Sequence, residues 1–161
     1  MATDKERAEL LELMRILIHH EPQVHYIQER PMRTVKLSRH EVLQKLHNGG
    51  NIAMDCSEAV TCLCKWAGLH DPNGRDFNGT GNTDTIYSHL HRYSQPWKAK
   101  VGALVVFGSY PHTHHVCMVA EPGHDPLLWS HGQERGPIWI PLHEEMKYQP
   151  RGVTFCSIAK L

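Results

Sequence analysis

A cysteine at position 56 stands where a helix is expected to begin, within the segment Met54–Glu58. A thiol in a first helical turn lies over backbone N–H groups that lack helical partners, at the positive end of the helix dipole. Both features favour the thiolate, which is the nucleophilic form of cysteine. The same N–H groups can bind the oxyanion that forms when a thiolate attacks a carbonyl. Cys56 is therefore a candidate nucleophile, and the alternative is a small buried core residue.

A histidine that could act as the base opens the predicted strand His115–Ala120. From there it could reach the start of a helix packed on the sheet, take the thiol proton and later protonate a leaving amine. His112 and His114 are rivals for this role, because spacing alone does not choose among the three. His131 ends the next predicted strand and could orient the imidazole. Most of the other histidines are expected to be solvated loop residues.

The chain has an odd number of cysteines, no Cys-x-x-Cys pair and no secretory signal, which argues against a disulfide framework and a zinc ribbon. Four of the five cysteines are expected to be core residues. These four are Cys62, Cys64, Cys117 and Cys156.

A metal site is the first competing interpretation of these residues. Histidine and cysteine are common zinc ligands, and the candidates are the cysteines with His112, His114, His115 and His131. No pair has the His-x-x-x-His spacing of a helical site, and 112–115 falls in a predicted turn. We therefore expect no metal and no cofactor. A chelator separates the two interpretations, because a cysteine peptidase should keep its activity in the presence of one.

Local signals place these residues in an order of helices followed by strands. Capping boxes at Thr3 and Ser38 predict helices over 3–20 and up to Leu46, and Asn48-Gly49-Gly50 ends the second. Asp55 is the expected cap of a helix from Cys56 to Ala67, and Thr83 of a short helix after it. Strands are predicted at Val101–Phe107, His115–Ala120, Leu127–Ser130, Ile138–Leu142 and Val153–Ile158.

The predicted fold class is therefore α+β, with the nucleophile helix packed on an antiparallel sheet. We expect a single domain over 1–161, made of an N-terminal helical segment 1–50 and a catalytic core 51–161. Lys and Arg number 17, as do Asp and Glu, so no strong field indicates a nucleic-acid or membrane partner. The charged N-terminus lacks the apolar run of a signal peptide, which favours a cytoplasmic site of synthesis.

Three motifs resemble those of the NlpC-type cell-wall cysteine peptidases, a papain-like family. Asp55-Cys56-Ser57 resembles the nucleophile motif, Val101–Phe107 the Gly-Asp-Leu-Val-Phe-Phe strand, and His115-Val116 the base strand. The matches extend over roughly Tyr26 to Leu142. Three further segments are similar to phage-encoded members that act on actinobacterial walls. These segments are Tyr26–Pro31, Ala67–Gly74 and Asp125–Glu134.

The resemblance implies a peptidoglycan hydrolase that cleaves stem peptides, usually next to D-glutamate or diaminopimelate. It implies Cys56 as nucleophile, His115 as base and His131 as the orienting residue, without a cofactor. Asp55 and Ser57 would support the nucleophile, and Tyr26 would correspond to a tyrosine that hydrogen-bonds near it. A phage lysin or virion enzyme, made in the host cytoplasm and acting at the cell wall, is the implied setting, with tail or virion proteins as possible partners.

Two departures from the family pattern keep alternatives open. Glu58 stands where the family generally has Gly, and Ala103 replaces the usual Asp of the strand motif. A carboxylate in the first turn stabilises the helix but opposes thiol ionisation. The chain could instead be an inactive wall-binding or structural module of a phage tail, or an N-acetylmuramoyl-L-alanine amidase. Position suggests Trp129, Tyr110 and the loop 70–82 as walls of a substrate groove.

Overall fold

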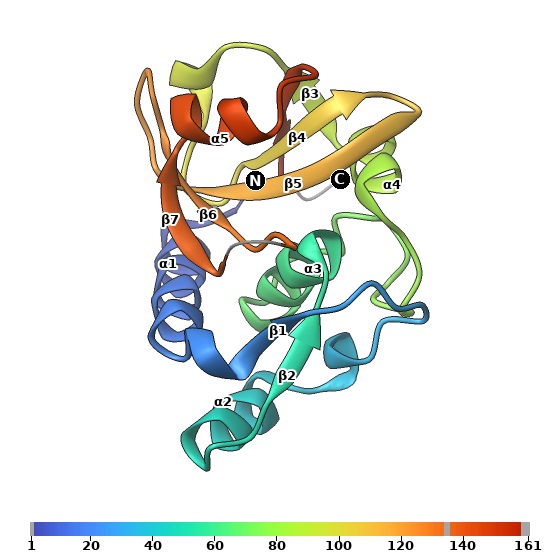
Figure 1. The fold of residues 1–161 in the computed structure, drawn as a ribbon, viewed down its shortest axis with the longest axis vertical. Coiled ribbons are helices and arrows are strands. Elements are labelled where there is room, and N and C mark those ends of the chain that lie inside the picture. The colour runs from blue at the N-terminus through green and yellow to red at the C-terminus, as the bar shows by residue number, and fades with distance from the viewer. Residues whose placement is uncertain (1, 134–135, 159–161) are drawn as a thin grey trace.

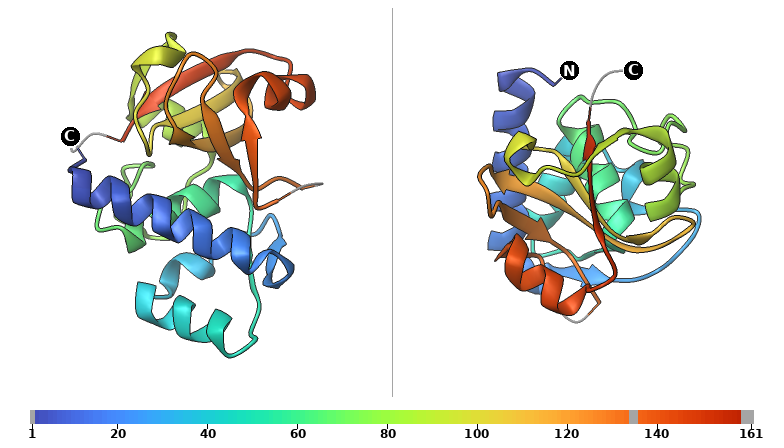
Figure 2. Two further views of the ribbon diagram at one scale, coloured as in Figure 1. Left: turned by 90° about the vertical axis from the view of Figure 1, so that its left-hand side faces the viewer. Right: turned by 90° about the horizontal axis from the view of Figure 1, so that it is seen from above.

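The computed structural model describes residues 2–133 and 136–158, which form an α+β fold with an antiparallel sheet. The helices are α1 (Asp4–His19), α2 (Arg39–His47), α3 (Cys56–Trp66), α4 (Thr83–His89) and α5 (Leu142–Tyr148), with 3-10 turns at Glu21–Gln23, Thr34–Lys36 and Pro96–Lys98. The strands are β1 (Val24–Tyr26), β2 (Ile52–Met54), β3 (His91–Tyr93), β4 (Leu104–Ser109), β5 (His112–Glu121), β6 (Leu127–Ser130), β7 (Ile138–Pro141) and β8 (Val153–Ser157). The large sheet lies between α5 on one side and α1 and α3 on the other (Figures 1 and 2).

Two helices begin at the capping boxes that the sequence predicts. The Thr3 hydroxyl accepts the Glu6 N–H at 3.1 Å, and the Glu6 carboxylate accepts the Thr3 N–H at 2.7 Å. Ser38 and Glu41 make the same reciprocal pair before α2. Each box satisfies two of the N–H groups that a helix start leaves unpaired, which fixes where α1 and α2 begin.

The sheet has six strands in the order β3-β8-β4-β5-β6-β7, all paired antiparallel. The long strand β5 lies near its centre and pairs with both β4 and β6. Side chains alternate between the faces of such a strand, so its buried residues divide into two groups. Val116 and Met118 join the core with the helices, whereas Cys117 and Val119 join a second cluster that includes Leu142 of α5.

The helix α3 is buried from its first residue to Cys64, rather than along the single stripe that the sequence pattern suggests. It lies under the sheet and beside α1 (Figure 1). Alanine, valine, leucine and cysteine side chains make most of its surface apolar, and the buried polar residues Ser57, Glu58 and Thr61 all have hydrogen-bond partners. The position of Cys56 is therefore set by a helix that packing holds on every side.

A short parallel pair of strands precedes this helix and was not expected from the sequence. Val24 pairs with Ile52 and Tyr26 with Met54, and the Ile27 N–H donates to the Met54 carbonyl at 3.2 Å. Three-residue strands carry too few residues to show a period of two. The pair brings Tyr26 to the end of β2, directly before α3.

Three predicted element starts are wrong. The strand β4 begins at Leu104 rather than at Val101, because 101 and 102 form a turn. The strand β5 begins at His112 rather than at His115, because 112–114 continue the hairpin with β4 across a bulge at Gly108, where φ is +101°. Helix α4 is capped by Asn82 rather than by Thr83: the Asn82 side chain accepts the Thr85 N–H at 3.1 Å. Asparagine is a stronger N-cap than threonine. The strand β3 and the helix α5 were also not predicted.

The segments 1–50 and 51–161 share one hydrophobic core, since Leu13 and Val42 lie in the same cluster as Leu63. Glu134, the last residue of the segment Asp125–Glu134, lies outside the described residues. Within 2–133 and 136–158, no helix combines the length and the apolar character needed to cross a membrane.

Candidate active site

Cys56 is the first residue of α3 and is 5% exposed, whereas the other four cysteines are fully buried. Asp55 caps the helix as predicted, because its Oδ1 accepts the Glu58 N–H at 2.8 Å. The N–H groups of Cys56 and Ser57 belong to the first turn, where no helical carbonyl precedes them. The thiol therefore lies at the positive end of a rigid helix, as the sequence indicates.

An arginine that the sequence analysis missed holds this helix start in place. The Arg30 guanidinium lies 2.9 Å from Asp55 Oδ2 and donates to the Ser57 hydroxyl at 2.8 Å. The Ser57 hydroxyl in turn donates to Asp55 Oδ1 at 3.0 Å. The Asp55 charge, which would oppose a thiolate at Cys56, is thus offset by a cation. Arg30 belongs to the segment Tyr26–Pro31, which resembles phage-encoded members, but that resemblance gave Arg30 no role and the segment has no periodic pattern.

Of the three candidate bases, His115 is the one that the fold buries and brings to Cys56. Its imidazole makes a hydrogen-bonding contact with the Cys56 thiol. Burial alone would lower the pKa of this imidazole. Cys117, Cys56 and Glu145 outweigh that effect and hold the pKa of His115 well above its usual range. His112 and His114 are exposed, and His114 contacts Gln149.

The Nε2 atom of His115 is surrounded by three other side chains. Glu145 Oε1 lies 3.2 Å from it, Ser130 Oγ 3.1 Å and Cys117 Sγ 3.3 Å. Glu145 comes from α5, which covers this face of the sheet, and it is 5% exposed. A buried carboxylate beside a buried imidazole can fix the ring orientation and stabilise its protonated form.

Glu145 was missed because the sequence analysis predicted no helix after β7. The segment Pro141-Leu-His-Glu-Glu145 is a signal for a short helix, with acidic residues in its first turn. That signal would not have distinguished Glu145 from the exposed Glu144. Only the packing of α5 on the sheet selects one of them.

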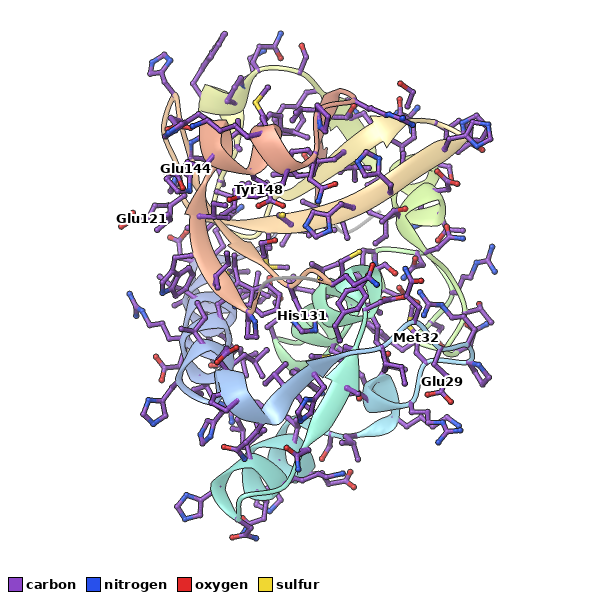
Figure 3. The ribbon with its side chains drawn as sticks, viewed as in Figure 1. Glu29, Met32, Glu121, His131, Glu144 and Tyr148 are labelled. Atoms are coloured by element: carbon purple, nitrogen blue, oxygen red, sulfur yellow. The ribbon has the colours of Figure 1, made fainter. Side chains whose placement is uncertain are left out.

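His131 lies beside the start of α3 (Figure 3), but neither of its ring nitrogens hydrogen-bonds to His115. Its Nε2–H donates to the carbonyl oxygens of Met54 at 2.9 Å and His25 at 3.1 Å. Its Nδ1 is buried without a hydrogen-bond partner. Burial lowers the pKa of this ring, which favours neutral imidazole. The contacts tie β6 to β1 and β2, and the orienting role of His131 stays a prediction.

Tyr26 lies close to the nucleophile, as the resemblance implied. Burial and, next, the proximity of Cys56 raise the pKa of the Tyr26 hydroxyl to about 12. The phenol is therefore protonated at neutral pH and can donate a hydrogen bond toward the thiol or an oxyanion. Its ring also lies against His131, with 5.5 Å between the ring centroids.

The two departures from the family pattern have structural explanations. Glu58 is buried, and its Oε2 accepts the N–H groups of Thr34 at 3.0 Å and Val35 at 3.3 Å. It thus anchors the segment that precedes α2 on the nucleophile helix. Ala103 continues the strand pairing through its backbone, since its carbonyl accepts the Val119 N–H at 2.8 Å.

The predicted groove walls differ in their outcome. Trp129 is fully buried in the core, so its assignment as a groove wall is wrong. An indole with an apolar strand context is as typical of a core as of a binding surface, and the sequence alone did not separate the two. Tyr110 is exposed and stacks on Tyr87, and its role stays a prediction.

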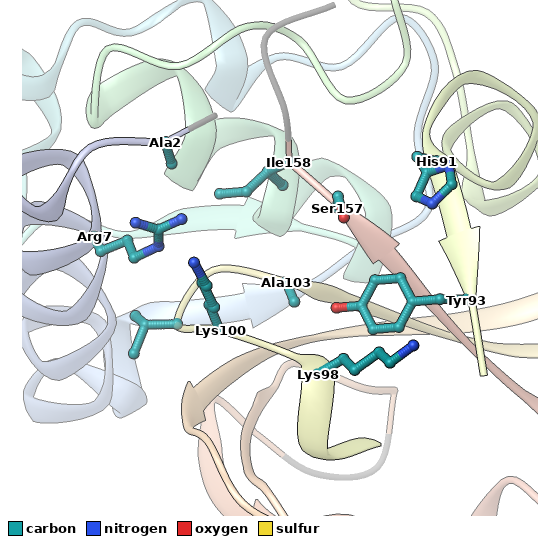
Figure 4. A pocket seen from close by; sticks show the side chains of 10 residues that line it. Ala2, Arg7, His91, Tyr93, Lys98, Lys100, Ala103, Ser157 and Ile158 are labelled. Carbon is teal, nitrogen blue, oxygen red and sulfur yellow. The ribbon is translucent and has the colours of Figure 1, made fainter. Parts of the chain in front are cut away.

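Two pockets lie outside the site just described. One, of about 380 Å³, is formed in part by His70, Pro72 and Phe77 of the loop 70–82. The other, of about 320 Å³, lies between α1 and the sheet and gathers Arg7, Lys98 and Lys100 (Figure 4). Neither is lined by Cys56 or His115.

No model of a known protein family matches this chain. Curated proteins likewise contain no match to it.

Glu58 makes the stability of the fold depend on pH. Burial raises its pKa from 4.5 to about 7 in the folded chain. Between these values the folded chain keeps a proton that the unfolded chain has lost, so the free energy of unfolding falls as pH rises. In Glu58→Gln, we expect the free energy of unfolding to decrease less over this pH range, by about 1–2 kcal/mol after allowance for solvent screening.

Denaturant unfolding at about pH 5 and about pH 8 measures this difference directly. Glu12→Gln, which replaces an exposed glutamate of α1, is the matched control and should keep the pH dependence of the parent. An unchanged pH dependence in Glu58→Gln would show that the carboxyl group is not the source.

Proposed function

We propose that this chain is a thiol peptidase with a papain-like, NlpC-type fold that cleaves stem peptides of bacterial peptidoglycan. The observation that carries the proposal is the imidazole of His115, which contacts both the Cys56 thiol and the Glu145 carboxylate. A nucleophile, a base within reach and a group that orients the base are the parts that covalent acyl transfer requires.

The reaction begins with attack of the Cys56 thiolate on a peptide carbonyl, with His115 holding the thiol proton. We assign the contact with Cys56 to Nδ1, because Nε2 already has Glu145, Ser130 and Cys117 around it. Backbone N–H groups at the start of α3 bind the oxyanion. His115 then protonates the leaving amine, which leaves a thioester on Cys56.

Water completes the cycle by attacking the thioester. His115 takes a proton from that water and returns it to the Cys56 sulfur as the thioester breaks. The shortened peptide then leaves with a free carboxylate. We also propose that Tyr26, which lies near Cys56, donates a hydrogen bond to the oxyanion in both halves of the reaction. No step in this sequence requires a cofactor.

The choice of peptidoglycan as substrate rests on the resemblance of the Asp55-Cys56-Ser57, Val101–Phe107 and His115-Val116 motifs to the cell-wall family. The same thiol chemistry would cut the sugar–peptide amide in a related amidase, so fragment analysis is part of the test. A phage lysin or a virion-associated enzyme remains the proposed setting, with the bacterial cell wall as the place of action.

Cys56→Ala is expected to lower peptidoglycan cleavage by at least about a thousandfold, because no other group can form the thioester. Turbidity loss and released amine ends on diaminopimelate-type peptidoglycan measure the activity, and mass spectrometry of the fragments names the bond. The matched control is Cys64→Ala, which removes a buried thiol from the same helix and should stay active.

Activity that is lost to EDTA but kept in Cys56→Ala would contradict the thiol mechanism. Folded protein without any activity would favour a structural or wall-binding role.

Glu145→Gln is expected to lower kcat about 10- to 1,000-fold with little change in KM, because the carboxylate orients His115 without touching substrate. Steady-state kinetics on a fragment released in the first assay separates the two constants. Glu144→Gln, which alters the neighbouring exposed glutamate of α5, is the matched control and should behave as the parent. A kcat loss in His131→Asn but not in Glu145→Gln would assign the orienting role to His131 instead.

A further inference from the structure

The side chains around Nε2 of His115 have the composition of a metal site. Histidine, cysteine and glutamate each offer one ligand atom, and the three atoms lie within 4.8 Å of one another. All three residues are buried, at 4% exposure for His115, 0% for Cys117 and 5% for Glu145. We propose that His115, Cys117 and Glu145 bind a zinc ion, and that the bound ion inhibits the enzyme by occupying its base.

The spacing of the ligand atoms fits a tetrahedral ion after a small expansion. Zinc bonds of typical length place nitrogen and sulfur about 3.5 Å apart, and nitrogen and oxygen about 3.4 Å apart. The corresponding separations from Nε2 are 3.3 Å to Cys117 Sγ and 3.2 Å to Glu145 Oε1. These two pairs therefore have to separate by only about 0.2 Å. The third pair, the Cys117 sulfur and a Glu145 carboxylate oxygen, lies within 4.8 Å, where a tetrahedral zinc ion needs about 3.6 Å.

The charges of the three ligands also fit a divalent cation. A neutral imidazole, a thiolate and a carboxylate together carry two negative charges, which balance zinc without further groups. Binding releases the thiol proton of Cys117 and the Nε2 proton of a protonated His115 to solvent, and the remaining ring proton of His115 stays on Nδ1. The Ser130 hydroxyl, 3.1 Å from Nε2, lies beside the fourth position, where the hydroxyl or a water can complete the tetrahedron.

Without a cation, these groups compete for one proton. A single ring N–H makes one good hydrogen bond, yet glutamate, serine and cysteine acceptors all lie within 3.3 Å of Nε2. A cation on Nε2 can be shared with the sulfur and the carboxylate oxygen, because the three ligand atoms lie within 4.8 Å of one another. Cys117 interacts with His115, Ser130 and Glu145, so it is not a purely apolar core residue.

The fold rather than the sequence spacing assembles the cluster. His115 and Cys117 are two apart on β5 and so lie on the same face of the sheet, and α5 lays Glu145 over that face. The cluster thus differs from the helical His-x-x-x-His spacing sought in the sequence, and it excludes His112, His114 and His131.

Occupation of the cluster removes the base from the reaction. An ion on Nε2 leaves the proton of neutral imidazole on Nδ1, so Nδ1 can no longer accept the proton of Cys56 or of water. This consequence for activity rests on the proposed peptidase function. The binding of zinc itself does not, because it requires only the three side chains.

Cobalt(II) titrated into the Cys56→Ala protein tests the binding directly. Cobalt occupies zinc sites and reports a thiolate ligand by a sulfur-to-metal charge-transfer band in the near ultraviolet. We expect one such cobalt ion per chain, displaced by zinc. The band should disappear when Cys117→Ser is added and persist when Cys156→Ser is added as the matched control. Adding Glu145→Gln should keep the band and weaken cobalt binding at least about tenfold.

Exposed histidines that bind cobalt give no sulfur band, so they do not imitate the expected result. Absence of the band in Cys56→Ala, a band that survives Cys117→Ser, or cobalt binding that Glu145→Gln does not weaken would each overturn the proposed site.

The inhibitory consequence is tested on the active enzyme with peptidoglycan as substrate. Zinc should lower the activity of the parent at least about tenfold and EDTA should restore it, whereas Cys117→Ser should resist zinc. Cobalt binding at the cluster without zinc inhibition of an active enzyme would overturn the regulatory part. Cobalt binding in a chain without peptidase activity would leave the metal site standing and remove the proposed function.

Discussion

The buried imidazole of His115 is the group around which this structure is organised. A ring nitrogen taken out of water must find a partner, and both sides of this ring have one. The start of α3 supplies a thiol, and α5 supplies a carboxylate from the face of the sheet on which Cys117 lies. Because the two partners come from opposite faces, the sheet must be covered on both sides. The two hydrophobic clusters, one under α3 and one under α5, meet this requirement.

The nucleophile side of the site is built from local signals and could be predicted. Asp55 and Glu58 mark the helix start, and a cysteine between them has the backbone environment of a first turn. Tyr26 follows from the resemblance of its segment. Arg30 and the partners of Glu58 could not be found in this way, because they join segments more than twenty residues apart through side chains on irregular backbone.

The base side depends on contacts that only the folded chain defines. His115 was identified from its place in a strand, although the strand begins three residues earlier than expected. Glu145 and Cys117 carry no sequence signal for their contact with it: one is among several glutamates, the other among several buried cysteines. Trp129 shows the opposite error, since a large aromatic residue near a predicted site proved to be core. Spacing along the chain describes helices well, but it does not describe which residues meet across a sheet.

The central claim is that His115 activates the Cys56 thiol, and the most direct measurement is the rate at which iodoacetamide alkylates each cysteine. At about pH 6 an ordinary thiol is almost entirely protonated and reacts slowly. We expect selective labelling of Cys56, read by mass spectrometry, and a rate at least about tenfold lower in His115→Gln. Equal rates in the two proteins, or labelling of another cysteine before Cys56, would contradict it.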